Sequence, residues 1–171
     1  CSYILGNPPF VGAKFQTDAQ RKDMLSVAHG VKNSGLLDYV TAWYFKAAEF
    51  IKDTPIQVGF VSTNSITQGE QVGILWGSLF AQGMTITFGH RTFPWQSEAR
   101  GKAHVHVVMI GFAQTYTGQK RIYEESDDTT TVTPAKNISP YLFEGANTVI
   151  LNRSTPLCPV PEIGIGNKPI D

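Results

Sequence analysis

Hydrophobic residues recur along the chain in runs whose period changes from one run to the next. Tyr3 to Leu5 is a short apolar run that stops at Gly6-Asn7-Pro8-Pro9, a pattern typical of a strand that ends in a tight loop. Residues 11–35 are polar and weakly periodic, which predicts a long loop with a single helical turn. Apolar residues from Leu36 to Ile51 follow helical spacing, and Asp53-Thr54-Pro55 ends this predicted helix.

The middle of the chain shows the same alternation of strand and helix. Val58 to Val61 is an apolar run of the kind found in parallel strands that are covered on both faces. Thr67-Gln68-Gly69-Glu70 matches a capping box, in which a hydroxyl and a carboxylate satisfy free backbone donors at a helix start. The second predicted helix continues from there to Phe80, and Gly83 suits its carboxyl-terminal cap.

Two more strands are predicted further along the chain. Residues 84–88 alternate apolar and polar side chains, residues 105–112 are strongly apolar, and residues 90–102 form a polar loop between them. The order strand, helix, strand, helix, strand, strand predicts an α/β fold with a mostly parallel sheet. The final two strands have no helix between them, so they should pair antiparallel as a β-hairpin.

The end of the chain differs in composition from the rest. Residues 124–140 are rich in Thr, Ser, Asp and Pro, which indicates a linker or an extended excursion, and an irregular tail follows from Tyr141. We therefore divide the chain into residues 1–118, part of one α/β domain, and residues 119–171, a linker or extension.

Composition narrows the class of protein. The chain has 171 residues, of which 42% are hydrophobic and 16% charged, as is ordinary for a soluble globular domain. Its formal net charge is zero, so no overall field draws it to nucleic acid, although a local basic surface could still bind DNA or RNA.

The two cysteines, Cys1 and Cys158, lie at opposite ends of the chain without metal-ligand spacing. They predict no disulfide framework and favour a reducing compartment, and no run is apolar enough to span a bilayer. Because the chain starts at Cys1, without Met and directly before a predicted buried strand, we interpret it as part of a longer protein.

Asn7-Pro8-Pro9-Phe10 lies where a strand ends, which is the place where open α/β sheets bind ligands. The Asn7 carboxamide oxygen and the Pro8 carbonyl could each accept one hydrogen of an exocyclic amine, and Phe10 could stack on the ring that carries it. Two acceptors on one NH2 group make its nitrogen more nucleophilic. The alternative is a plain Pro-Pro turn with Phe10 in the core.

Gly6-Asn7-Pro8-Pro9-Phe10 after a short apolar strand resembles motif IV of the S-adenosylmethionine-dependent amino-methyltransferases. Longer phrases are similar to the methyltransferase part of the MmeI-like bacterial restriction–modification enzymes, which both cut and methylate DNA. These phrases are Leu37-Asp38-Tyr39-Val40-Thr41-Ala42-Trp43-Tyr44, Phe60-Val61-Ser62-Thr63-Asn64-Ser65-Ile66-Thr67-Gln68-Gly69-Glu70-Gln71, His90-Arg91-Thr92-Phe93 and Ser97-Glu98-Ala99-Arg100-Gly101-Lys102-Ala103. The resemblance runs from about Tyr3 to Phe112 and implies a Rossmann-like class I methyltransferase sheet.

The resemblance further implies transfer of a methyl group from S-adenosylmethionine to N6 of an adenine that has left the stack of duplex DNA. Asn7, Pro8, Pro9 and Phe10 would be the catalytic motif. A second stacking residue is expected from the loop between the last two strands, and Phe93 occupies the matching position, with Trp95 as its nearest rival. Otherwise Phe93 is a loop aromatic that covers the sheet edge.

Several cations lie close to these motifs and could contact DNA phosphates, although plain solvation explains each of them equally well. They are Arg91, Arg100 and Lys102 around Phe93, and Lys14, Arg21 and Lys22 after Phe10. His104 and His106 share a strand face, but no third ligand is recognisable, so no metal is predicted.

The glycine-rich turn that binds the cofactor in this fold is not recognisable in the chain, and Gly164-Ile165-Gly166 comes too late and precedes no helix. We therefore expect the intact protein, a cytoplasmic bacterial enzyme whose endonuclease and target-recognition segments lie elsewhere in the polypeptide, to be active and this chain alone to be inactive. Methylation of a protein glutamine or an RNA base, and a non-catalytic DNA-binding or interaction module, are the alternatives.

Overall fold

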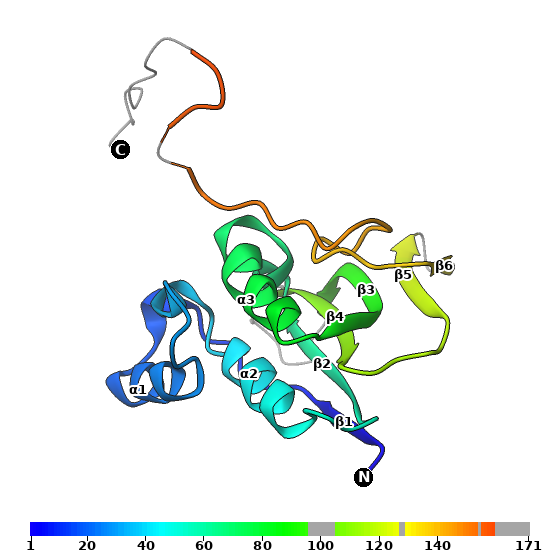
Figure 1. Ribbon diagram of the computed structural model, residues 1–171, viewed down its shortest axis with the longest axis horizontal. Coiled ribbons are helices and arrows are strands. Elements are labelled where there is room, and N and C mark those ends of the chain that lie inside the picture. The colour runs from blue at the N-terminus through cyan, green and yellow to red at the C-terminus, as the bar shows by residue number, and fades with distance from the viewer. Residues whose placement is uncertain (96–104, 127–128, 154, 160–171) are drawn as a thin grey trace.

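A six-stranded sheet in the order β1-β2-β4-β3-β5-β6 forms the centre of the protein (Figure 1). The structure is a computed structural model and describes residues 1–95, 105–126, 129–153 and 155–159. The strand bounds are β1 Tyr3–Gly6, β2 Gln57–Thr63, β3 Thr85–Trp95, β4 Val105–Ala113, β5 Lys120–Ser126 and β6 Thr129–Ala135. The predicted α/β fold class is confirmed.

The strand pairing sets the direction of every strand. β1 is parallel to β2 and β3 is parallel to β5, whereas β4 is antiparallel to both β2 and β3, and β6 is antiparallel to β5. Thus β1, β2, β3 and β5 point one way and β4 and β6 the other. β4 fills the space between β2 and β3, which confirms the predicted antiparallel pairing of β3 with β4.

Helices α2 (Thr41–Phe50) and α3 (Gly69–Ala81) cover one face of the sheet (Figure 1). Tyr44 of α2 and Trp76 of α3 are fully buried, and the rings of Tyr44 and Phe112 stack with centroids 5.3 Å apart. Tyr44 also meets Phe60 and Trp76 edge to face. Aromatic pairs of this kind contribute about 0.5–1.5 kcal/mol each beyond the burial of their area, so this cluster fixes both helices on the sheet.

Helix α1 (Asp18–Val27) occupies a region that the sequence predicted as loop, so that prediction is wrong for these residues. Thr17 and Gln20 form a reciprocal capping box: the Gln20 N–H donates to the Thr17 hydroxyl, and the Gln20 side chain accepts from the Thr17 N–H. Met24 is the one buried residue of the helix. The short 3-10 helices η1 (Ala13–Phe15) and η2 (Ser34–Leu36) lie on either side of it.

The capping box predicted at the start of α3 is wrong. Residues Asn64–Thr67 form the 3-10 helix η3, and the Thr67 hydroxyl donates to the Asn64 carbonyl at 2.9 Å. The helix cap is Gln68, whose side chain makes no capping hydrogen bond. At the other end of α3, Gly83 follows the cap with a φ of 81°, which confirms the predicted glycine stop.

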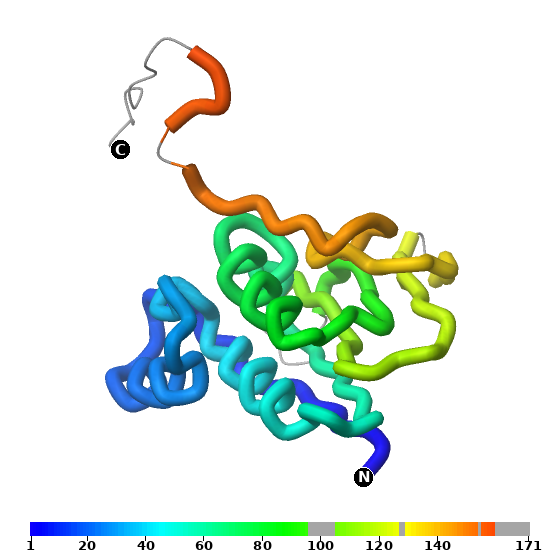
Figure 2. Tube along the Cα trace, in the orientation of Figure 1, coloured from blue at the N-terminus to red at the C-terminus, as the bar shows by residue number. Residues whose placement is uncertain are grey.

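Strands β5 and β6 lie where the sequence predicted a linker or an extended excursion. β5 pairs with β3, and the Thr-rich β6 is exposed except at Ala135. The described chain beyond β6 is irregular and passes along α3 (Figure 2). The predicted division after residue 118 falls between two strands of one sheet and stays a prediction. Among the described helices, none has the length and apolar character needed to cross a membrane.

Candidate functional site

The carboxyl ends of β1 and β2 lie beside each other at one edge of the sheet. The two strands are parallel and in register from the pair Tyr3–Gln57 to the pair Gly6–Phe60. The chain leaves β1 at Gly6 and continues directly into Asn7-Pro8-Pro9-Phe10. Ligands of open α/β sheets bind outside the carboxyl ends of the strands, so this motif lies where such a sheet can use it.

Burial alternates within the motif. Pro8 is buried and Phe10 packs, partly buried, against the hydrophobic core, whereas Asn7 and Pro9 are exposed. Among the described residues none hydrogen-bonds the Asn7 carboxamide, so its oxygen can accept a hydrogen from a ligand. The rings of Pro8 and Pro9 fix the backbone that carries the Pro8 carbonyl. The motif therefore combines a rigid backbone with an accessible amide.

The chain just after the motif is tied to the segment that precedes α2. The Tyr39 N–H donates to the Val11 carbonyl at 2.8 Å, and the Gln16 side-chain amide donates to the Leu37 carbonyl at 2.9 Å. The Gln16 side chain is itself buried. These contacts fix the path of the chain between Phe10 and α1.

Asp38 is a residue of this region that sequence reasoning did not single out. It is 6% exposed, and its carboxylate accepts hydrogen bonds from the Ala13 N–H at 3.3 Å, the Thr63 hydroxyl at 3.0 Å and the Gln71 amide at 3.2 Å. The Asp38 N–H donates to Gln71 Oε1 at 3.0 Å. The available signal was an acidic residue within the apolar phrase Leu37-Asp38-Tyr39-Val40, where an unpaired charge would be costly.

Cations predicted to contact phosphate lie on the chain that follows the motif. Lys14 is exposed on η1 and lines, with Arg21, a cavity of about 450 Å³ that Asp38 and Gln71 also line. The Arg21 Nε–H donates to the Gln16 carbonyl at 3.3 Å. Arg100 and Lys102 lie outside the described residues.

Arg91 is held by contacts within the protein. Its Nη1 lies 2.8 Å from Glu124 Oε2, its Nε–H donates to the Leu142 carbonyl at 3.1 Å, and its guanidinium lies 4.3 Å from the centroid of the Phe143 ring. These contacts tie β3 to β5 and to the loop after β6. A phosphate contact by Arg91 stays a prediction, and it would compete with the Glu124 carboxylate.

Phe93 and Trp95 lie on β3, so the prediction that they belong to a loop is wrong. Phe93 pairs with Val107 and Trp95 pairs with Val105 of β4. Strand β3 therefore continues through residues 90–95, which the sequence predicted as part of a polar loop. A register shift between His90 and Phe93 brings their rings to a centroid distance of 4.6 Å. Phe93 is partly buried and Trp95 is 37% exposed, so both remain candidates for stacking.

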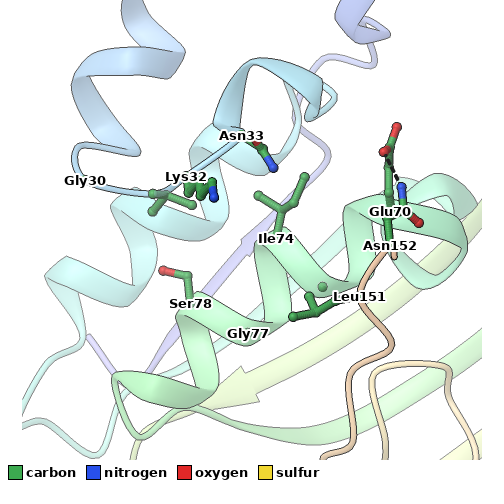
Figure 3. A pocket seen from close by; sticks show the side chains of 11 residues that line it. Gly30, Lys32, Asn33, Glu70, Ile74, Gly77, Ser78, Leu151 and Asn152 are labelled. Atoms are coloured by element: carbon green, nitrogen blue, oxygen red, sulfur yellow. Dashed lines mark hydrogen bonds between the residues drawn. The ribbon is translucent and has the colours of Figure 1, made fainter. Parts of the chain in front are cut away.

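A second cavity, of about 530 Å³, lies between α3 and the chain segment Gly30–Asn33 (Figure 3). Leu151 and Asn152 of the tail close its other side, and the Asn152 amide donates to Glu70 Oε2 at 2.9 Å (Figure 3). No residue predicted for the site lines this cavity.

Metal ligands are not grouped in the part of the chain that the structure describes, where no three His, Cys, Asp or Glu side chains come close enough to hold an ion. His106 is exposed on β4, and His104 lies outside the described residues. Cys1 and Cys158 are exposed and free.

Known proteins match this chain over nearly its full length. The family model described as "MmeI, DNA-methyltransferase domain" matches residues 1–124. DNA methyltransferase A of Bacillus subtilis (strain 168) is 42% identical over 169 residues, which cover 99% of this chain and 19% of that protein. The Type IIL restriction-modification enzyme MmeI, solved in complex with DNA, matches at 48% identity and a TM-score of 0.89 over 94% of this chain and 22% of that one. The chain thus spans about a fifth of the length of these relatives. It belongs to the family of MmeI DNA-methyltransferase domains.

Proposed function

We propose that the protein to which this chain belongs methylates N6 of adenine in duplex DNA as part of a restriction–modification system. The observation that carries the proposal is the position of Asn7-Pro8-Pro9-Phe10 at the carboxyl end of β1, with an accessible amide on a rigid backbone, in a member of this family. This chain would supply the part of the active site that holds the target amine.

Asn7 and Pro8 would prepare the amine for attack. The Asn7 Oδ1 atom and the Pro8 carbonyl oxygen would each accept one N6 hydrogen, which leaves the nitrogen lone pair directed at the methyl group of the donor. N6 would gain the methyl group and lose one proton to solvent, and the electron pair of the broken methyl–sulfur bond would stay on the donor sulfur. Such positioning and polarisation are the main contributions a protein can make to a direct displacement. No side-chain nucleophile is required, so neither cysteine needs a catalytic role.

Aromatic side chains would hold the adenine outside the DNA stack. Extruding a base costs a few kcal/mol, and stacking on an aromatic side chain returns about 1–3 kcal/mol per base. Phe10 at the motif is one platform, and Phe93 at the end of β3, with Trp95 beside it, is the candidate for the second. Two platforms together would offset the extrusion cost.

S-adenosylmethionine is the methyl donor that this class of enzyme uses, and it would supply an electrophilic methyl group. None of the described strands ends in a glycine-rich turn that leads into a helix, the element that binds the cofactor in this fold. We infer that residues outside the described ones provide most of the cofactor site and that residues 1–171 alone are inactive.

Lys14, Arg100 and Lys102 are proposed as phosphate contacts that would orient the duplex without reading its sequence. Arg91 is a weaker candidate because Glu124 already pairs with it. The zero net charge of the chain requires that any such binding surface be local.

The family match favours DNA over the alternative substrates. The matched model is a DNA-methyltransferase domain, and the curated relative is named as a DNA methyltransferase, so methylation of protein glutamine or RNA has no support of its own. The same family match does not favour a non-catalytic module that only binds DNA or a protein partner.

The test uses the full-length protein, labelled S-adenosylmethionine and duplex DNA that is afterwards digested to nucleosides. Label on N6-methyladenine is the expected result. Label on cytosine, or on protein or RNA in place of DNA, would contradict the proposal. Residues 1–171 expressed alone should transfer no label under the same conditions.

A further inference from the structure

We propose that Asp38 is a positioning residue for methyl transfer: its buried carboxylate ties the chain after Asn7-Pro8-Pro9-Phe10 to the end of β2 and to α3. The inference rests on the proposed function and adds a residue that acts on the site through other groups. Asp38 is not itself placed against the target base.

The carboxylate connects three segments that are far apart in the sequence. Oδ1 accepts from the Ala13 N–H, on the chain after the motif, and from the Gln71 amide on α3. Oδ2 accepts from the Thr63 hydroxyl at the last residue of β2. Asp38 itself precedes α2, so four elements that surround the candidate site meet at one side chain.

The surroundings of Asp38 explain why an acidic residue suits this position. A carboxylate offers about four acceptor sites on two oxygens, and here three neutral donors use them. Burial of a charge is costly unless such partners are present, and the side chain is 6% exposed. An apolar residue would leave the Ala13 N–H, the Thr63 hydroxyl and the Gln71 amide without this acceptor.

The hydrogen bond from the Ala13 N–H to Asp38 acts on residues 11–13, the segment that directly follows the Asn7-Pro8-Pro9-Phe10 motif. The bond from the Tyr39 N–H to the Val11 carbonyl and the bond from the Ala13 N–H to Asp38 join adjacent residues of one segment to residues two apart on the other, so together they clamp the three residues that follow Phe10. Thr63 lies at the same sheet edge as Asn7, because β1 and β2 are parallel. Asp38 therefore fixes the motif's downstream anchor relative to the strand beside it.

Loss of this anchor should affect catalysis far more than cofactor binding. A displacement of about 1 Å at a reacting group can lower a rate by roughly 100-fold. Asp38→Ala in the full-length protein should therefore lower kcat for DNA methylation by roughly 100-fold, with the KM for S-adenosylmethionine within about threefold of wild type. Asp38→Asn preserves the shape and most acceptor geometry, and should recover activity to within about tenfold of wild type, since the role is positional.

Asp23→Ala is the matched control, because the carboxylate of Asp23 accepts a hydrogen bond from the Tyr39 hydroxyl at 3.0 Å but makes no hydrogen bond to residues 11–13 among the described residues. It should leave kcat unchanged. A 2-aminopurine at the target position provides the second readout: its fluorescence change on binding should fall in Asp38→Ala and return in Asp38→Asn.

Methylation of adenine by the wild-type protein is measured first. Its absence would refute the proposed function and would not bear on the positioning role of Asp38. With an active wild type, Asp38→Ala at full kcat would overturn the positioning role. Equal losses in Asp38→Ala and Asp38→Asn would also overturn it, since they would mean that the charge matters and not the hydrogen-bond geometry. If Asp38→Ala does not fold, Thr63→Val removes one tether alone: a reduced kcat with unchanged cofactor KM supports the role, and an unchanged kcat refutes it.

Discussion

The hydroxyl groups of Tyr44 and Ser62 lie 2.7 Å apart, and both side chains are completely buried between α2 and β2. Each hydroxyl is the hydrogen-bond partner of the other. Among the described residues, no buried side-chain nitrogen or oxygen lacks a partner. This pair therefore lets two polar groups enter the core at β2, the strand that borders the candidate site.

Tyr44→Phe should destabilise the fold by about 1–3 kcal/mol, because it leaves the Ser62 hydroxyl buried without a partner. The double variant Tyr44→Phe with Ser62→Ala should recover most of that loss, since removing both polar groups avoids the desolvation cost. Urea unfolding of the three proteins measures both effects. Additive losses in the double variant would show that the hydroxyls do not act as a pair.

Alkaline pH should weaken the fold through the same residue. Burial raises the pKa of Tyr44 well above its ordinary value of 10.0, with the Ser62 hydrogen bond acting in the opposite direction. The folded state keeps this proton longer than the unfolded chain, so the stabilisation is complete below pH 10 and is lost as the pH rises beyond it. Unfolding free energies of wild type and Tyr44→Phe should therefore converge as the pH rises from 10 to about 11. A constant difference across that range would contradict the shift.

Asn7→Ala should abolish methyl transfer and leave the unfolding free energy within about 0.5 kcal/mol of wild type, because the Asn7 side chain is exposed. Single-turnover assays with the full-length protein measure the rate, and thermal unfolding measures the stability. Ser2→Ala, at an exposed position outside the motif, is the comparison and should keep full activity. Full activity of Asn7→Ala would exclude the carboxamide as the amine acceptor.

Phe93→Ala should reduce the fluorescence change of a 2-aminopurine placed at the target position, because the extruded base would lose a stacking partner worth about 1–3 kcal/mol. Trp95→Ala is its rival on the same strand. A normal signal in Phe93→Ala together with a reduced one in Trp95→Ala would move the stacking role to Trp95. Normal signals in both would exclude this end of β3 from base capture.

Two glycine-to-alanine substitutions should change stability in opposite directions. A Cβ atom at Gly111 on β4 would collide with the Phe88 ring, so Gly111→Ala should cost about 1–3 kcal/mol. A Cβ atom at Gly77 on α3 would have no neighbour within 4 Å, so Gly77→Ala should stabilise the helix by about 0.5–1 kcal/mol. Chemical unfolding of both variants measures the two changes in stability. Destabilisation by Gly77→Ala would indicate a contact in the cavity between α3 and the segment Gly30–Asn33, which Gly77 lines.

Periodicity predicted the elements whose apolar residues face the core. The helix spacing after Leu36 and the apolar run around Val58 correspond to α2 and β2, both of which pack around Tyr44. Helix α1 escaped prediction because it buries Met24 alone, and a helix with one buried residue has no apolar stripe to detect. Its capping box at Thr17 and Gln20 was the remaining signal.

Local signals misled where tertiary contacts dominate. Thr67 and Glu70 have capping-box spacing, yet the Thr67 hydroxyl turns back to the Asn64 carbonyl and Glu70 binds Asn152 of the tail. Strand β6 is exposed and polar, so pairing with β5 and not burial defines it. The motif at Asn7 was visible as a phrase, whereas Asp38 depends on partners at residues 13, 63 and 71, which only the folded chain brings together.

The central position of β4 has a consequence for how the molecule is made. β2 and β3 each pair with β4 and not with each other, although the ribosome synthesises both of them first. The sheet cannot close until residues 105–113 have left the exit tunnel, so the Asn7 loop waits for about a hundred residues of further synthesis before its surroundings are complete. A nascent chain that stops before β4 would expose the open sides of β2 and β3 together, and we expect such truncated products to be targets for chaperones and proteases.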